Sequence, residues 1–115
     1  MNCRKETFNI DPRSTFAMKI TLKDREGNLL PINTDFRLLF LGASSGNNKF
    51  EVSQRNGVKT KCFVEDGKLF ARFENYNLSG LLMVEIWEFF EDENAKAGHW
   101  RWVSTKNTNV KITRI

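Results

Sequence analysis

The chain has 115 residues, of which 40% are hydrophobic and 28% are charged, so it has the size of one ordinary globular domain. This composition argues against general disorder, and no run of about 18 apolar residues could span a membrane as a helix. Residues 1–5 are not followed by an apolar segment, so we expect no secretory signal. A multidomain enzyme, a membrane channel and a disulfide-stabilised mini-protein are therefore excluded.

The charge is basic and unevenly distributed. The net charge is +4 and the isoelectric point is about 9.3, a value at which nucleic-acid binding has to be considered. Acidic residues gather at Glu85, Glu88, Glu91, Asp92 and Glu93. Residues 94–115 contain no acidic residue but five basic ones, namely Lys96, Arg101, Lys106, Lys111 and Arg114. This pattern predicts two neighbouring patches of opposite sign, which are either solvated faces or docking surfaces for a charged partner or a second copy.

The first third of the chain has the hydrophobic period of β-strands. Apolar residues at 16, 18, 20 and 22 alternate with mainly polar ones, which predicts a half-buried strand over Phe16–Leu22. Residues 24–28 predict a turn, followed by a short returning strand at 29–32. The next strand is predicted at 35–41, and the small polar residues 42–48 after it predict a loop.

Two dipeptides in the middle of the chain predict tight hairpin turns. Asn56-Gly57 and Asp66-Gly67 are typical of type I′ turns, in which both central residues have positive φ. They divide this region into strands at 50–55, 58–65 and 68–75. We therefore predict a three-stranded antiparallel meander.

The segment Leu81–Phe90 is apolar in both phases, so a helix and a central strand compete for it. Its Val, Ile, Trp and Phe residues favour the strand, as do the neighbouring strand predictions. A polar loop is expected at 91–98. A terminal hairpin is then expected, with strands at 100–105 and 110–114 joined by the polar residues 106–109.

Together these elements predict an all-β fold, an antiparallel β-sandwich or partly closed barrel of seven to eight strands. Residues 16–115 form its single domain. Residues 1–15 are polar and lack a clear period. They predict an arm that is either disordered or ordered by a partner, adding to a neighbouring subunit's sheet with Phe8 and Ile10 as anchors.

Few residues in the chain are suited to catalysis or to metal binding. Cys3, Cys62 and His99 are too few for a structural zinc site, and no secretory context suggests a disulfide. Cys62 lies in the apolar phase of a predicted strand, so a Cys62–His99 dyad is disfavoured against a buried core thiol. Residues 91–94 predict a plain acidic loop rather than a calcium site, and Glu85 and Glu88 are expected on opposite faces of their strand. We predict no enzymatic activity, no cofactor and no metal.

Aromatic residues near the C-terminus give the strongest signal of a surface function. Trp100 and Trp102 share a strand phase and flank Arg101, and Trp87 and Phe89 share a phase of the preceding strand. Core packing could explain these residues. However, a domain of this size has little interior, and Trp and Arg are enriched where proteins bind each other. These residues, with Phe8 and Ile10, are the predicted interface candidates.

Two other binding functions remain as alternatives. Lys59, Lys61 and Arg72 surround Phe63 on predicted strands, as on a sheet face that binds single-stranded nucleic acid. A solvated outer face explains the same residues more simply, so nucleic acid is not the preferred partner. Alternatively, exposed tryptophans could stack on sugar rings in a carbohydrate-binding sandwich.

Five segments of the chain resemble a family of small virion proteins from Bacteroides-infecting tailed phages and their prophages: Met18–Asp24, Asp35–Leu38, Phe50–Val58, Cys62–Leu69 and Phe73–Glu85. The resemblance spans roughly residues 16–91 and is weakest after residue 94. It implies a β-sandwich module at the base of tail or head fibres, or in a baseplate. The expected role is assembly without catalysis, in several copies per virion, with other virion structural proteins as partners and no membrane association.

Overall fold

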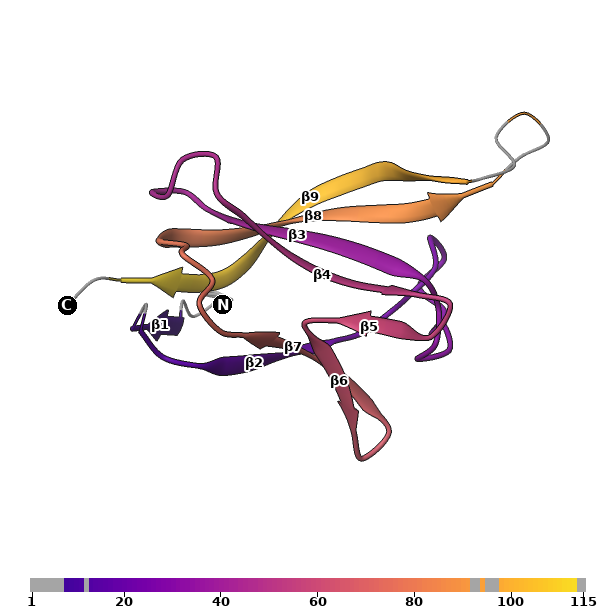
Figure 1. The fold of residues 1–115 in the computed structure, drawn as a ribbon, viewed down its shortest axis with the longest axis horizontal. Coiled ribbons are helices and arrows are strands. Elements are labelled where there is room, and N and C mark those ends of the chain that lie inside the picture. The colour runs from indigo at the N-terminus through magenta and orange to yellow at the C-terminus, as the bar shows by residue number, and fades with distance from the viewer. Residues whose placement is uncertain (1–7, 12, 92–93, 95–97, 114–115) are drawn as a thin grey trace, which may run out of the picture.

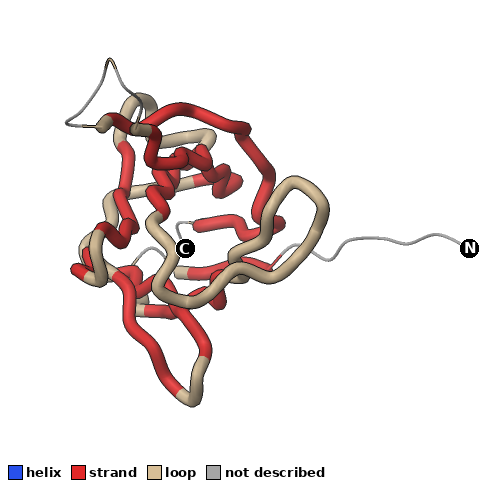
Figure 2. Tube along the Cα trace, turned by 90° about the vertical axis from the view of Figure 1, so that its right-hand side faces the viewer, coloured by secondary structure: helices blue, strands red, loops and turns tan. Residues whose placement is uncertain are grey.

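The computed structural model describes residues 8–11, 13–91, 94 and 98–113, and the regular structure in these ranges is entirely β-strand (Figures 1 and 2). A six-stranded sheet has the order β1-β9-β8-β3-β4-β5, and a three-stranded sheet has the order β2-β7-β6. The predicted all-β sandwich is therefore confirmed, with nine strands in the described ranges rather than the expected seven to eight. Within these ranges no helix is long and apolar enough to cross a membrane. The strands are β1 (Phe8–Ile10), β2 (Phe16–Ile20), β3 (Phe36–Gly42), β4 (Lys49–Arg55), β5 (Val58–Thr60), β6 (Cys62–Glu65), β7 (Lys68–Phe73), β8 (Gly80–Phe90) and β9 (His99–Ile112).

Both predicted hairpin turns are confirmed. Asn56 and Gly57 have φ values of 53° and 78°, and Asp66 and Gly67 have values of 50° and 71°. These positive angles are those that a type I′ turn requires. The turns join β4 to β5 and β6 to β7, and the β6–β7 hairpin extends away from the rest of the fold in both views (Figures 1 and 2).

The predicted continuous strand over 58–65 is wrong. Lys61 has a φ of 57° and separates β5, which pairs with β4, from β6, which pairs with β7. The chain thus passes from the large sheet to the small one at this corner, and the predicted meander is split between two sheets. Alternation of apolar residues continues across Lys61, so the sequence pattern could not reveal the kink.

The predicted terminal hairpin is also wrong. Residues 99–112 form a single 14-residue strand along β8. Leu82 pairs with Val110, whereas the next residue, Met83, pairs with Asn107, so two residues of β9 form a bulge. Asn109 has a φ of 61° there. The polar residues that suggest a turn are therefore accommodated as a bulge within a continuous strand.

Residues 29–32 do not form the predicted strand. Only one isolated bridge, between Lys23 and Leu29, is formed there. The segment is held instead by the fully buried Gln54, whose Nε2 donates to the carbonyl oxygens of Ile32 and Thr34, both at 2.9 Å. This side-chain amide acts together with one backbone bond, in which the Leu30 amide donates to the Leu22 carbonyl oxygen at 2.9 Å.

Leu81–Phe90 adopts the strand and not the helix, since β8 lies between β9 and β3 in the large sheet. The core lies between the two sheets, on the side of β3 and β4 that faces the small sheet. At its centre is the fully buried Phe73, whose ring centroid lies 4.5 Å from that of Phe16 and 5.0 Å from that of Phe50. Phe40 meets the same ring edge-on at 4.8 Å. The predicted inward phases of β2, β3 and β7 supply these contacts.

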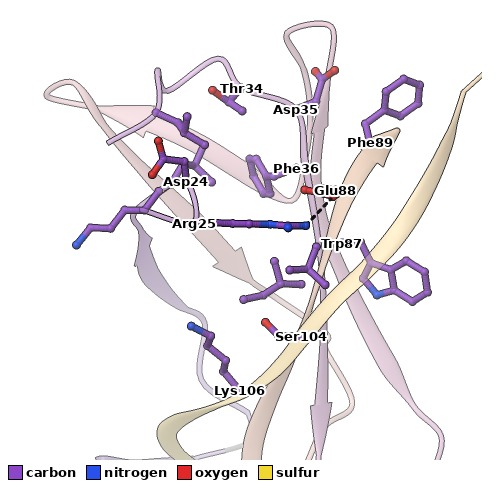
Figure 3. Close-up of a pocket in the computed structure, with 15 residues that line it drawn as sticks. Asp24, Arg25, Thr34, Asp35, Phe36, Trp87, Glu88, Phe89, Ser104 and Lys106 are labelled. Atoms are coloured by element: carbon purple, nitrogen blue, oxygen red, sulfur yellow. Dashed lines mark ion pairs between the residues drawn. The ribbon is translucent and has the colours of Figure 1, made fainter. Parts of the chain in front are cut away.

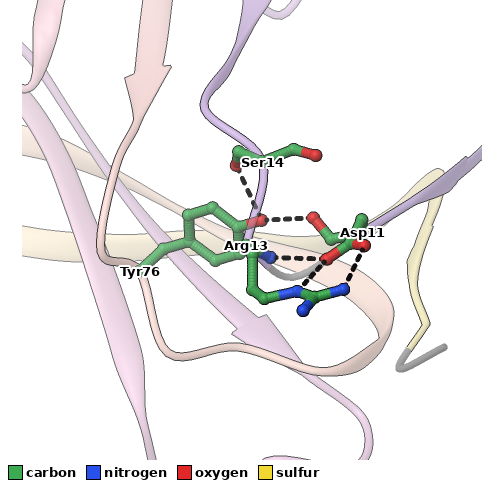
Figure 4. Close-up of polar contacts among 4 residues, drawn as sticks. All are labelled: Asp11, Arg13, Ser14 and Tyr76. Carbon is green, nitrogen blue, oxygen red and sulfur yellow. Dashed lines mark hydrogen bonds and ion pairs between the residues drawn. The ribbon is translucent and has the colours of Figure 1, made fainter.

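Tyr76 ties the segment after β1 to the core (Figure 4). The side chain is buried, and its hydroxyl oxygen lies 3.1 and 3.0 Å from the carbonyl oxygens of Asp11 and Ser14, which share its single proton as acceptors. Arg13 bridges to the Asp11 carboxylate at 3.1 Å, and this hydrogen bond holds the pKa of Asp11 below its usual value. A polar cluster therefore fixes the link between β1 and β2.

Replacing Tyr76 by Phe should lower the free energy of unfolding by about 1–2 kcal/mol, because the carbonyl oxygens of Asp11 and Ser14 lose the donor that they share. Urea denaturation measures this change. Amides of β1 should also exchange faster in Y76F, since the link to β2 is loosened. The control R13A removes only an exposed ion pair and should change stability by less than about 0.5 kcal/mol. Equal stability of Y76F and the wild type would contradict this role.

Candidate protein-interaction surface

Four aromatic side chains lie together on the outer face of the six-stranded sheet. Trp87 pairs in register with Trp102, and Phe89 with Trp100. Directly opposed residues of neighbouring strands point to the same face, so we call these four residues the aromatic patch. The Phe89 and Trp100 rings meet edge-on with centroids 5.4 Å apart. Trp102 is 53% exposed, and the other three are half-buried.

Two arginines from other strands lie over the patch. The Arg37 guanidinium carbon, on β3, lies 5.5 Å from the centroid of the Trp87 ring. The corresponding carbon of Arg55, on β4, lies 3.7 Å from the centroid of the Phe89 ring. Arg37 Nε also donates to Glu51 Oε1 at 2.7 Å. The patch thus combines aromatic rings with guanidinium groups, the residue types that dominate binding energy at protein interfaces.

The aromatic patch is not part of the buried core. The core cluster uses other residues of β8 and β9, such as Leu82 and Val110. The halves of β8 and β9 that carry the aromatic patch, which we call the distal halves, extend together beyond the other strands (Figure 1). Four of the predicted interface candidates are therefore brought together on one face outside the core.

Arg101, the fifth candidate in this region, lies on the opposite face of β9. It forms an ion pair with Glu88, and its guanidinium carbon lies 4.7 Å from the centroid of the Phe90 ring. One acidic residue and one basic residue of the two predicted patches therefore pair with each other within the chain. This removes at least one of the charges that were predicted to attract a partner. Asp92, Glu93, Lys96 and Arg114 lie outside the described residues.

The two N-terminal candidates are not part of the aromatic patch. Phe8 and Ile10 lie in β1, which pairs in parallel with residues 110–112 at the C-terminal end of β9. Ile10 packs against the core cluster. In this structure the segment therefore adds to the sheet of its own chain.

The candidate dyad is not assembled. Cys62 lies in the small sheet, where its thiol donates to the Ser53 carbonyl oxygen at 3.4 Å and burial raises its pKa. A raised pKa keeps the thiol protonated and unreactive. His99 lies at the start of β9 in the large sheet, with its ring against Phe90.

The candidate carboxylates have different partners. Glu85 accepts hydrogen bonds from Lys49 Nζ at 3.2 Å and from Trp87 Nε1 at 3.3 Å. Glu88 pairs with Arg101 as described above. Within the described ranges, no three His, Cys, Asp or Glu side chains gather in a way that could hold a metal ion.

The residues proposed for nucleic-acid binding come together only in part. A shallow depression of about 170 Å³ is lined by Lys61, Cys62, Phe63, Arg72 and Glu74. The Phe63 ring already stacks on Phe70, with centroids 5.4 Å apart, and Arg72 Nε donates to Glu74 at 2.8 Å. Lys59 belongs to β5 in the other sheet. The aromatic ring and one cation of this surface are thus engaged within the chain.

A groove of about 760 Å³ opens on the inner side of the distal β8–β9 ribbon (Figure 3). Its opposite wall is the 22–36 segment, from which Arg25 reaches to 3.9 Å from Glu88. Asp24 organises the turn there by accepting the backbone amides of Asn28 and Glu26, which lowers the pKa of Asp24. The residues of this groove come from distant segments, so no local sequence pattern could predict it.

The chain matches neither a protein-family model nor any curated protein.

Proposed function

We propose that the chain is a non-enzymatic assembly module of a phage-like particle, present in several copies. In this proposal it joins fibre, baseplate or capsid components, and the aromatic patch is its docking surface. The phage setting rests on the sequence resemblance over residues 16–91.

The aromatic patch is the observation that supports this proposal most. Four rings lie on one face outside the core, and Arg37 and Arg55 hold two of them by stacking. Rigid aromatic groups lose little side-chain entropy on binding, and Trp102 offers a largely exposed ring. A protein surface that covers this face would remove the exposed apolar area from water.

Replacing Trp102 by Ser tests the patch within the particle. We expect W102S to fold, because its ring is largely exposed, and to be incorporated into particles at least about tenfold less than the wild type. Mass spectrometry of particles purified from the producing bacteria measures incorporation. The matched control L29S removes a side chain that is 73% exposed and lies outside the patch, so its incorporation should be normal. Equal incorporation of W102S and the wild type would contradict the proposal.

Carbohydrate binding is the second candidate, and the exposed ring of Trp102 is the observation that favours it. A glycan that stacks on this ring should change the tryptophan fluorescence of the wild type but not of W102S. A saturable change of this kind, combined with normal particle incorporation of W102S, would favour glycan binding over assembly.

A further inference from the structure

We propose that the open edge of β2 accepts an extended, acidic segment of a partner protein as an additional strand. Among the described residues the small sheet has three strands against six in the large sheet, and it covers the large sheet incompletely. The uncovered inner face beside β2 is the floor of this second site. The inference does not rest on the proposed function, because none of the four residues of the aromatic patch lines the groove beside β2 that is described below.

The directions of the backbone groups in β7 identify which edge of β2 is open. The Arg72 amide donates to the Lys61 carbonyl oxygen at 2.8 Å, on the β6 side of β7. Backbone groups alternate in direction along a strand, so those of Ala71 face β2. Ala71 is in register with Met18, and the N–H and C=O of Met18 therefore face β7.

The same alternation applies along β2. Met18, and by the same register Phe16 and Ile20, direct their backbone groups to β7. The N–H and C=O of the intervening Ala17 and Lys19 must then point to the other side, where the sheet order places no strand among the described residues. These are the donors and acceptors that an added strand needs.

An apolar floor lies beside this edge. A groove of about 590 Å³ is bounded by β2 residues, including Met18, and by Leu38, Val84 and Ile86 of the large sheet. It shares seven residues with the groove of about 760 Å³ described above: Leu22, Lys23, Asp24, Arg25, Phe36, Ile86 and Lys106. Leu38 and Val84 pack against the core but stay partly exposed. Alternate side chains of an added strand could cover this floor.

The charges around the groove favour an acidic strand. The acidic side chains that line the two connected grooves are already engaged: Asp24 by backbone amides, Asp35 by Arg55 and Glu88 by Arg101. The lysines of the groove beside β2 are Lys19, Lys23 and Lys106, and none of them forms an ion pair within the described part of the chain. The unbalanced charge at the rim is therefore positive, which selects for acidic residues in the occupant.

Hydrogen exchange of the full chain, followed residue by residue by NMR, is the test. In the free protein the amides of Ala17 and Lys19 should exchange fast and that of Met18 slowly. The probe is a synthetic peptide of about nine residues in which valine and glutamate alternate. It should slow exchange at Ala17 and Lys19, and a peptide with lysine in place of glutamate should bind at least about tenfold more weakly.

Two variants distinguish the contribution of the backbone donor at the open edge from that of the Lys19 charge. K19P removes a donor at the open edge, where proline is tolerated, and should lower peptide affinity at least about tenfold. K19A removes only the charge and should have a smaller effect. W102S should bind the peptide normally, so this result is independent of the proposed function. If K19P fails to fold, the exchange data on the wild type still decide the question.

Several outcomes would overturn the proposal. Slow exchange at Lys19 in the free protein would show that the edge is not open. Protection that appears on concentrating the protein alone would identify a second copy as the occupant, and protection by single-stranded DNA but not by the peptide would identify a nucleic acid. Failure of both peptides to bind would contradict the proposal and would indicate that the lysines prevent strand pairing at this edge.

Discussion

Replacing Phe73 by Ala should lower the free energy of unfolding by about 3–5 kcal/mol, the largest loss expected for a single truncation in this chain. The Phe73 side chain is fully buried. Its ring stacks on those of Phe16 and Phe50 and meets the edge of Phe40, so the variant loses contacts to both sheets at once. These neighbours belong to three different strands and cannot all move into the vacated space.

Urea denaturation of F73A, followed by the tryptophan fluorescence of the β8–β9 ribbon, measures this effect. F63A is the matched control, because Phe63 is only half-buried and its stacking partner Phe70 lies outside the core cluster. Its loss should be less than half that of F73A. Equal losses in the two variants would contradict the position of Phe73 at the centre of the core.

Replacing Gly42 by Ala should cost at least about 2 kcal/mol. A Cβ atom at this position would lie 2.2 Å from the Ser79 carbonyl oxygen and 2.7 Å from the Ser79 amide nitrogen. Both atoms belong to the backbone, so relief requires the end of β3 to move away from the segment before β8. The close approach is itself held by the Ser44 amide, which donates to the Ser79 oxygen at 3.0 Å.

Thermal or urea unfolding of G42A measures this cost, with G46A as its control. Gly46 has a φ of 67° but open space around the added carbon, so G46A should show only the strain of that backbone angle, about 1 kcal/mol. A G42A variant that is as stable as G46A would contradict the close contact at Ser79.

The elements that the sequence predicts well are those with local signals. The period of two places Phe16, Phe36 and Phe73 on inward faces, and the two hairpin dipeptides define their turns. The errors occur where the backbone departs from regular strand geometry. Lys61 and Asn109 both adopt positive φ without a neighbouring glycine, so the kink between β5 and β6 and the bulge in β9 have no local signature.

The candidate surface was predictable only in part, for a similar reason. The phase of each strand groups Trp87 with Phe89 and Trp100 with Trp102, but pairing of β8 with β9 is needed to unite the four. Arg37 and Arg55 lie far from the tryptophans in the sequence and reach the rings only through the arrangement of β3 and β4 in the sheet. The groove beside β2 depends on where the small sheet ends, which no single segment encodes.

A cryo-EM map of the native particle tests the central proposal most directly. The account predicts several symmetry-related copies of this sandwich, each with another protein chain packed on Trp87, Phe89 and Trp102. Particles that lack the chain, or that contain it with this face open to solvent, would contradict the assignment of the aromatic patch as the docking surface of an assembly module.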